Sequence, residues 1–423
     1  MPEIIETEIG FIPKHWTIVT FDKALKVKGR VGWKGYKTSD LRNEGPVVVG
    51  GTNIKANLYL DFSQTTYLSR EKFEESPEIM LQRGDVILVT RGNGIGDVGY
   101  YDGQFPEATI NPSLVILSQF IGNPKYLFYY LNSPQGRFQV LSIEGGTSIP
   151  ALYQGYINTL LCPIPPIKEQ EFMVEILSSI DEKINLLHRQ NQTLEHLAGT
   201  FFKRKLTTNA AKWEMKPLGE FIETTLGGEW GKEKPENEFT FQVCCIRGTD
   251  IADLQTGLAD RTPIRFVKEK KFESITPNEG DIILEISGGT DDQSTGRAVY
   301  INESNRTLFP YPLIFSNFCR LIKVKKREFS YFLHLYLQYL YQQDEFFNLE
   351  NGSSGIKNLD YKYLLFELNF LLPSNEQELI EFNKEVKLLF EKINNNKHQI
   401  RTLIKLRDTL LPKLMSGEVR VEN

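Results

Sequence analysis

The sequence contains little that would form a disulfide framework or a zinc site. Only four of its 423 residues are cysteines, and no two of them form a CxxC pair. The five histidines stand singly and form no cluster with the cysteines. We therefore expect reduced structural thiols, with neither disulfides nor bound zinc.

Long apolar runs are also absent. No stretch of about 18 apolar residues occurs, which is the length that a membrane-spanning helix needs. The first ten residues, MPEIIETEIG, are acidic and do not resemble a secretory signal peptide. The sequence therefore predicts a cytoplasmic chain that is not embedded in a membrane.

Motifs of common catalytic sites are missing or incomplete. There is no GxxxxGK[ST], GxSxG or HExxH motif. A GxGxxG pattern spans residues 94–99, but the YYDGQFPE that follows is typical of a strand and a turn, which favours a surface turn over a dinucleotide site. Asp281 and Glu285 resemble half of a nuclease carboxylate pair, but Ser287 follows and no lysine completes it. We expect neither a hydrolytic metal site nor a cofactor.

Excess positive charge is absent as well. The formal net charge is -5. Residues 1–166 carry 15 basic and 16 acidic side chains, and residues 211–373 carry 19 and 24. If DNA is bound, local basic loops or a partner must neutralise most of the phosphates.

Two long stretches dominate what is present. Residues 167–206 contain no proline and a single glycine. A second long stretch with the same apolar spacing covers residues 374–415. In both, apolar residues recur in alternating steps of three and four, the spacing of a coiled-coil seam. One asparagine interrupts each seam, Asn191 in the first and Asn396 in the second. The seam positions include Leu177, Ile180, Ile184, Leu187, Leu194 and Phe201 in the first stretch, and Val386, Leu389, Ile393, Ile400 and Leu403 in the second.

The chain is one unit written twice. Trp16 and Trp213 open its two halves, and Asp85 and Asp281 each follow a glycine and precede an apolar strand. A glycine-rich turn, a helix-like segment and a second loop then follow in each half. We expect an α+β fold of two similar mixed α/β lobes, each followed by a long helix. The residues leave parallel and antiparallel pairing open, and our expectation is an antiparallel coiled coil.

The expected boundaries follow from this duplication. They are a first lobe at 1–166, a central long helix at 167–208, a second lobe at 209–373 and a C-terminal long helix at 374–423.

The loops of both lobes carry side chains suited to reading base edges. Arginine and lysine bind guanine, asparagine and glutamine bind adenine, and serine and threonine are adaptable donors. Each residue alone is better explained by ordinary turn chemistry. The loops recur at matching places with different letters, which suits two lobes that read two different sequences. The candidates are Lys34, Tyr36, Lys37, Arg91, Asn93, Thr147 and Ser148 in the first lobe, and Trp230, Lys232, Arg247, Gln293, Arg297, Ser353, Ser354 and Lys357 in the second.

The helix-bearing segments resemble the specificity subunits of type I restriction–modification systems. PIPPIKEQEFMVEILSSIDEKI at 163–184 and LAGTFFKRKL at 197–206 resemble the central conserved region of that family. LRDTLLPKLMSGEVRV at 406–421 resembles its C-terminal conserved region. The resemblance covers the whole chain.

This resemblance implies a non-catalytic subunit with two target-recognition domains, each reading one half of a split, asymmetric site in double-stranded DNA. The helices would act as a ruler and would dock two methyltransferase (modification) subunits. Restriction subunits would join through the complex. In such systems S-adenosylmethionine binds the modification subunit, whereas ATP and magnesium bind the restriction subunit. The methyltransferase motif [DN]PP[YF] is absent here, as expected for a specificity subunit that serves DNA methylation and host defence.

Two alternatives remain on the residues alone. One is a two-lobed structural adaptor that holds two protein partners without reading DNA. The other is an enzyme built on the GxGxxG turn.

Overall fold

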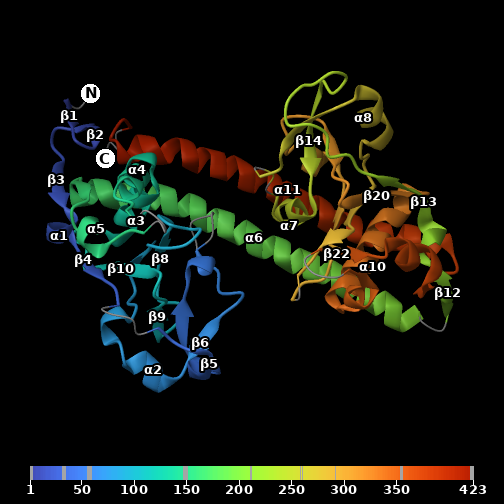
Figure 1. Cartoon of the computed structure of the whole chain (residues 1–423), viewed down its shortest axis with the longest axis horizontal. Coiled ribbons are helices and arrows are strands. Elements are labelled where there is room, and N and C mark those ends of the chain that lie inside the picture. The colour runs from blue at the N-terminus through green and yellow to red at the C-terminus, as the bar shows by residue number, and fades with distance from the viewer. Residues whose placement is uncertain are drawn as a thin grey trace. The chain divides into compact units, whose positions relative to one another are not determined.

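The computed structural model describes residues 3–30, 35–54, 60–145, 151–209, 212–257, 259, 261–290, 292–352 and 356–419. The chain forms two compact units, one of residues 1–183 with 404–423 and one of residues 184–403. Two helices contribute to both units, α6 (Ile167–Asn209) and α11 (Glu376–Met415). Both ends of the chain belong to the first unit (Figure 1).

The first lobe is built on a four-stranded sheet in the order β4-β10-β7-β8 and a three-stranded sheet in the order β6-β5-β9. Hairpin β1-β2 and the pair β3-β11 complete its strands. The strands are β1 (Ile4–Thr7), β2 (Gly10–Pro13), β3 (Thr17–Thr20), β4 (Lys26–Lys28), β5 (Leu41–Val49), β6 (Thr66–Leu68), β7 (Val86–Val89), β8 (Val98–Tyr100), β9 (Ala108–Ile110), β10 (Leu114–Ser118) and β11 (Leu161–Ile164). The helices are α1 (Phe21–Ala24), α2 (Arg70–Glu74), α3 (Pro124–Asn132), α4 (Pro134–Ser142) and α5 (Gln154–Ile157), with short turns η1 (Thr38–Asp40), η2 (Gly51–Asn53) and η3 (Pro77–Ile79).

The second lobe contains a four-stranded sheet in the order β13-β20-β16-β18 and two three-stranded sheets, β15-β14-β19 and β17-β22-β21. Its strands are β12 (Glu214–Pro217), β13 (Ile222–Gly227), β14 (Phe241–Ile246), β15 (Ile264–Val267), β16 (Ile282–Glu285), β17 (Ser287–Gly288), β18 (Ala298–Tyr300), β19 (Leu313–Phe315), β20 (Cys319–Val324), β21 (Glu350–Asn351), β22 (Lys357–Leu359) and β23 (Asn369–Leu372). Its helices are α7 (Gly248–Thr256), α8 (Glu269–Ile275), α9 (Glu303–Arg306) and α10 (Ser330–Gln342), with short turns η5 (Leu218–Phe221), η6 (Arg327–Phe329), η7 (Glu345–Leu349) and η8 (Tyr363–Glu367).

The two lobes share one strand topology. In the four-stranded sheets, β10 pairs antiparallel with β4 and β7, and β20 pairs antiparallel with β13 and β16. In the three-stranded sheets, β5 is parallel to β9 and antiparallel to β6, as β14 is to β19 and β15. The predicted α+β fold of two similar lobes is therefore confirmed.

A tryptophan ties each lobe to the start of its long helix. The indole Nε1 of Trp16 donates to Glu169 at 3.0 Å, and that of Trp213 donates to Glu378 at 2.8 Å. Each glutamate is the third residue of its helix, where the helix dipole favours negative charge. The two halves thus use the same contact at the same place.

The two long helices run antiparallel. In the second unit the Asn396 side-chain amide donates to Asn191 at 2.9 Å, and Lys205 pairs with Glu385 at 3.3 Å. Since one partner number rises as the other falls, the helices have opposite directions. This confirms the predicted antiparallel pairing and places the two seam asparagines against each other.

Most predicted seam residues are buried, namely Leu177, Ile180, Ile184, Leu187, Val386, Ile393 and Ile400, whereas Leu194, Leu389 and Leu403 are half-buried. The end of the α6 seam needs a correction. Phe202, rather than the expected Phe201, is the fully buried residue there. Its ring packs edge-on against Phe332 and Tyr336 of α10, at centroid distances of 5.4 and 5.1 Å. Phe382 of α11 lies 6.2 Å away. The lobe therefore shifts the buried face of α6 by one residue.

A polar network crosses the helix pair within the first unit. Arg407 of α11 pairs with Asp181 of α6 at 3.2 Å, and both side chains are largely buried. The hydroxyl of Tyr129, from α3, donates to the same carboxylate at 2.7 Å. Arg407 also pairs with Asp408 at 2.9 Å, and Tyr129 belongs to the apolar core that contains Leu177 and Leu411. The network fixes the lobe and both helices at one point.

No helix in the described parts of the chain combines the length and the apolar character that a membrane crossing requires.

The seam predicts opposite outcomes for two adjacent leucines. Leu187 is 1% exposed, whereas Leu186 is 40% exposed. We expect Leu187→Asp to lower the free energy of unfolding by several kcal/mol, because it buries an unpaired carboxylate. Leu186→Asp, the matched control, should change it by less than about 0.5 kcal/mol. Urea unfolding followed by circular dichroism measures both. Equal stability of the two variants would contradict the seam.

Candidate nucleic-acid interface

The glycine–aspartate step before each central strand is a turn. Gly84 and Gly280 have φ values of +97° and +99°, which favour glycine. The carboxylate of Asp85 accepts from the backbone N–H of residue 82 at 2.7 Å, and that of Asp281 accepts from residue 278 at 2.8 Å. Burial raises the pKa of both carboxyl groups, although these backbone hydrogen bonds act in the opposite direction. The two aspartates therefore close the turns that precede β7 and β16.

The turn after β7 lies against the second predicted loop of the first lobe. Arg91 forms an antiparallel bridge with Ala151, which also bridges Gly145. The side chains of Arg91 and Asn93 are exposed. The structure thus brings together two loops that lie more than 50 residues apart in the chain. The predicted contacts Thr147 and Ser148 lie outside the described residues.

The GxGxxG turn has the wrong surroundings for a dinucleotide. The Gly96 N–H donates to the Val89 carbonyl at 2.9 Å, and the chain continues into strand β8. A dinucleotide site needs these glycines to open a helix whose N-terminus meets the pyrophosphate. Residues 94–99 therefore form a turn between two strands.

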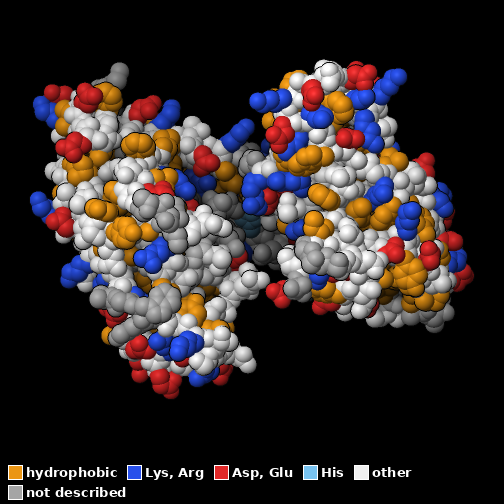
Figure 2. Space-filling model, in the orientation of Figure 1, with side chains coloured by type: hydrophobic (Ala, Val, Ile, Leu, Met, Phe, Trp, Pro, Cys, Tyr) orange, Lys and Arg blue, Asp and Glu red, His pale blue; other side chains and the backbone are white. Residues whose placement is uncertain are grey.

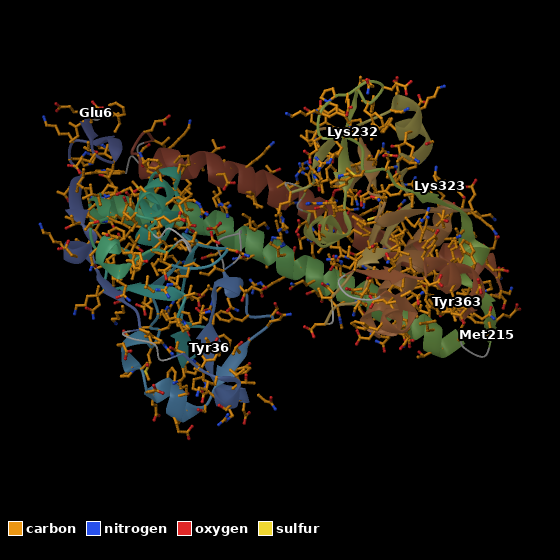
Figure 3. The ribbon with its side chains drawn as sticks, in the orientation of Figure 1. Glu6, Tyr36, Met215, Lys232, Lys323 and Tyr363 are labelled. Atoms are coloured by element: carbon orange, nitrogen blue, oxygen red, sulfur yellow. The ribbon has the colours of Figure 1, made fainter. Side chains whose placement is uncertain are left out.

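The remaining predicted loop of the first lobe is partly described. Tyr36 is half-buried, and burial raises the pKa of its hydroxyl while the nearby Arg30 cation opposes that rise. Lys37 is exposed, and its backbone N–H donates to Asp40 at 2.7 Å. Figure 3 labels Tyr36 in the first unit. Lys34 lies outside the described residues.

In the second lobe, the turn after β16 pairs with the loop that follows α10. β17 pairs with β22, which pairs with β21. The Lys357 ammonium donates to the Thr290 carbonyl at 2.9 Å and lies 3.6 Å from Glu350. Gln293 is exposed and its amide donates to the Tyr341 hydroxyl at 3.2 Å. Ser353 and Ser354 lie outside the described residues.

Two predicted contacts of the second lobe have internal partners. Arg247 donates through Nε and Nη2 to the buried Asp250, at 3.0 and 2.8 Å. Arg297 donates through the same two atoms to Glu285, at 2.8 and 2.6 Å. Both guanidinium groups would have to leave a bidentate carboxylate to reach a base. Sequence patterns do not reveal such pairs, since the partners are identified only by the fold.

Trp230 and Lys232 lie in another part of the second lobe. Trp230 is half-buried, and the Arg265 guanidinium lies 4.3 Å from the centroid of its ring. Lys232 is exposed, and its backbone N–H donates to the Phe266 carbonyl at 2.9 Å. Figure 3 shows Lys232 beside the loops around β14, away from the position of β22 in Figure 1.

Two asparagines beside the predicted residues were not among the predicted contacts. Asn351 of β21 and Asn358 of β22 are exposed and lie directly opposite each other in the ladder. The alternation within the sequence KNL could have indicated that Asn358 faces away from the core. It lies between the half-buried Lys357 and the buried Leu359.

Positive charge is not concentrated on the face that Figure 2 shows. Blue and red side chains alternate over both units on that face. This agrees with the acidic net charge of -5. Among the described residues no three histidine, cysteine, aspartate or glutamate side chains are grouped so that they could hold a metal ion.

The chain is thus a duplicated α+β lobe on an antiparallel helix pair, with paired loops at equivalent places. The family model of the type I restriction modification DNA specificity domain matches residues 16–196 and 211–402. The chain therefore belongs to the type I restriction–modification specificity subunit family.

Known relatives cover nearly the whole chain. It is 26% identical to the type I restriction enzyme MjaIX specificity subunit of Methanocaldococcus jannaschii, over 99% of this chain and 97% of the relative. The MjaVIII specificity subunit of the same organism is 22% identical, over 97% and 95%. The crystal structure of the S subunit from M. genitalium has a TM-score of 0.53 and 18% identity, and covers 95% of this chain and 96% of that one. This last similarity shows the shared fold.

The ion pair of Arg297 with Glu285 yields a stability prediction. Glu285 has a side-chain exposure of only 2%. We expect Arg297→Leu to destabilise the second lobe by about 3–5 kcal/mol, because an unpaired charge stays buried. The double variant Glu285→Leu with Arg297→Leu should recover most of that loss. Urea unfolding of the three proteins measures the effect. A single variant as stable as the parent would show that Glu285 does not need its partner.

Proposed function

We propose that this chain reads a bipartite, asymmetric site in double-stranded DNA, with one lobe for each half-site. The observation that carries the proposal is the recurrence of one loop arrangement. In each lobe, the turn after the central strand pairs with a loop that lies later in the chain. The pairing joins Arg91 to Ala151 in the first lobe and Ser287 to Asn358 in the second. The frame is the same while the side chains differ, as two independent readers of different sequences require.

The chain acts without catalysis of its own in this proposal. Two methyltransferase subunits dock on it, and restriction subunits join through that complex. The acidic net charge supports this division, because a protein with few surplus cations gains little from counterion release. Partner subunits would then neutralise most phosphates, and the lobes would supply the sequence readout.

The outer faces of the helices offer a surface for such partners. Leu388 is 70% exposed on α11, and Leu197 is exposed on α6. Exposed leucines on a helix flanked by charged residues suit the apolar face of a partner helix.

Lobe exchange tests independent readout. Replacing residues 1–165 by the corresponding lobe of another specificity subunit should change one half of the recognised sequence and leave the other half intact. The assay is genome-wide mapping of methylated bases in cells that carry the chimaera and its methyltransferase subunit. The unexchanged chain is the control. A change in both half-sites would argue against independent lobes.

Partner docking is tested at the exposed leucine of α11. We expect Leu388→Asp to weaken assembly with the methyltransferase subunit by about tenfold or more, because a charge replaces apolar contact area. The unfolding midpoint should stay that of the parent. Gln399→Asp, also at an exposed position of α11, is the control for added charge. Size-exclusion chromatography and titration measure assembly, and equal affinity of both variants would exclude this docking surface.

A further inference from the structure

The sheet β17-β22-β21 places three hydrogen-bonding residues in one row. In its ladder Ser287 lies opposite Asn358, and Asn358 lies opposite Asn351. Residues directly opposite in antiparallel strands project from the same face of the sheet. One face therefore presents a serine and two asparagines side by side, and both asparagines are exposed.

The other face of this sheet anchors it to the lobe. Leu359 is buried in the apolar core of the second unit, and the Glu350 side chain is only 6% exposed. Lys357, on the same face as Leu359, donates to the Thr290 carbonyl. The Glu350 carboxylate also accepts from the Thr295 backbone N–H. Since these contacts use the alternate residues, the side chains of Asn351 and Asn358 stay exposed on the opposite face.

The base of the sheet is fixed by the Glu285 carboxylate. A side chain added at Gly248 or Gly288 would approach its Oε1 to 2.3 or 2.7 Å, so backbone encloses the carboxylate on two sides. Arg297 binds the same group. β17 begins two residues after Glu285. The row therefore stands on a rigid support, which base readout by hydrogen bonds requires.

We infer that Asn358 and Asn351 read adenine in the major groove of the half-site bound by the second lobe. The inference rests on the proposed function and adds to it the reading element and the base. Asparagine binds the N6 and N7 atoms of adenine through two hydrogen bonds, and a small β-sheet can enter the major groove. Strands lie about 4.8 Å apart, so the three-strand row spans about 10 Å. The major groove is about 12 Å wide. Figure 1 places β22 beside α10 at the rim of the second unit.

The equivalent row in the first lobe has a different chemistry. Its bridged residues are Arg91, Ala151 and Gly145. Of these only Arg91 carries a hydrogen-bonding side chain, and arginine prefers guanine. The same backbone position thus distinguishes the two half-sites.

The test uses the full-length chain with its methyltransferase subunit and a library of randomised duplex DNA. Asn358→Asp and Asn351→Asp keep the size of the side chain and replace its amide donor by a second acceptor oxygen. An aspartate accepts from the N4 amino group of cytosine. We expect each variant to lose the adenine preference at one position, about 10- to 100-fold, and to favour cytosine there. Asn358→Gln should retain adenine. Asn369→Asp, at an exposed asparagine of β23, is the control for added charge.

A second experiment compares two duplexes, one selected by the parent and one in which 7-deazaadenine replaces the adenine whose preference the variant lost. 7-Deazaadenine lacks the N7 acceptor. The parent should bind this duplex about tenfold or more weakly, whereas Asn358→Asp or Asn351→Asp should bind both duplexes alike. Variants that select the sequence of the parent would overturn the inference, as would a uniform loss of binding without a change of base. A parent that selects no sequence at all would instead overturn the proposed function.

Discussion

The burial of one helix seam in two places supports the rest of the structure. In the first unit, Leu177 of α6 and Leu414 of α11 pack into the aromatic core of α3. In the second unit, Phe202 and Phe382 of the same helices pack against α10. Each lobe completes its core only with both helices present. Neither lobe therefore has a complete hydrophobic core without the long helices. The boundary between the two units accordingly falls within both helices.

A polar pair at the seam gives the helix pair its register. Asn191 and Asn396 are both buried and bond to each other, while apolar residues fill the positions around them. Such a pair stabilises the fold less than apolar residues would, but other alignments would lose the hydrogen bond between the two amides. The tryptophan–glutamate contact at the start of each helix has a similar effect, since it ties the first strands of a lobe to one helical turn.

Duplication has kept the frame and changed the loops. The strand order and the aspartate turn recur in both lobes, yet Val89 occupies the place of Glu285 at the end of the central strand. In each case the backbone N–H of that residue donates to a carbonyl, Asp97 in one lobe and Arg297 in the other. One backbone therefore supports an apolar contact in the first lobe and a buried ion pair in the second. Such interior differences let two equal frames hold loops of different shape.

The sequence by itself determined the parts of this protein that have a period or a repeat. Alternating steps of three and four residues indicated both long helices, and recurring landmarks such as Asp85 and Asp281 revealed the two lobes. Burial of an apolar stripe is a local rule, so it can be read from the order of residues. The resemblance of the conserved segments indicated the family, which the comparisons confirmed.

Only the tertiary structure decided which loop residues have a free side chain. Arg247 and Arg297 had the chemistry of base contacts, but the fold places a carboxylate beside each. Asn358 and Asn351 were not predicted from the sequence, because the face of the sheet on which they lie depends on the register of three short strands. The direction of the helix pair was likewise open, because the seam spacing is the same in parallel and antiparallel pairs. Partners far apart in the chain decide these points, and no local pattern contains them.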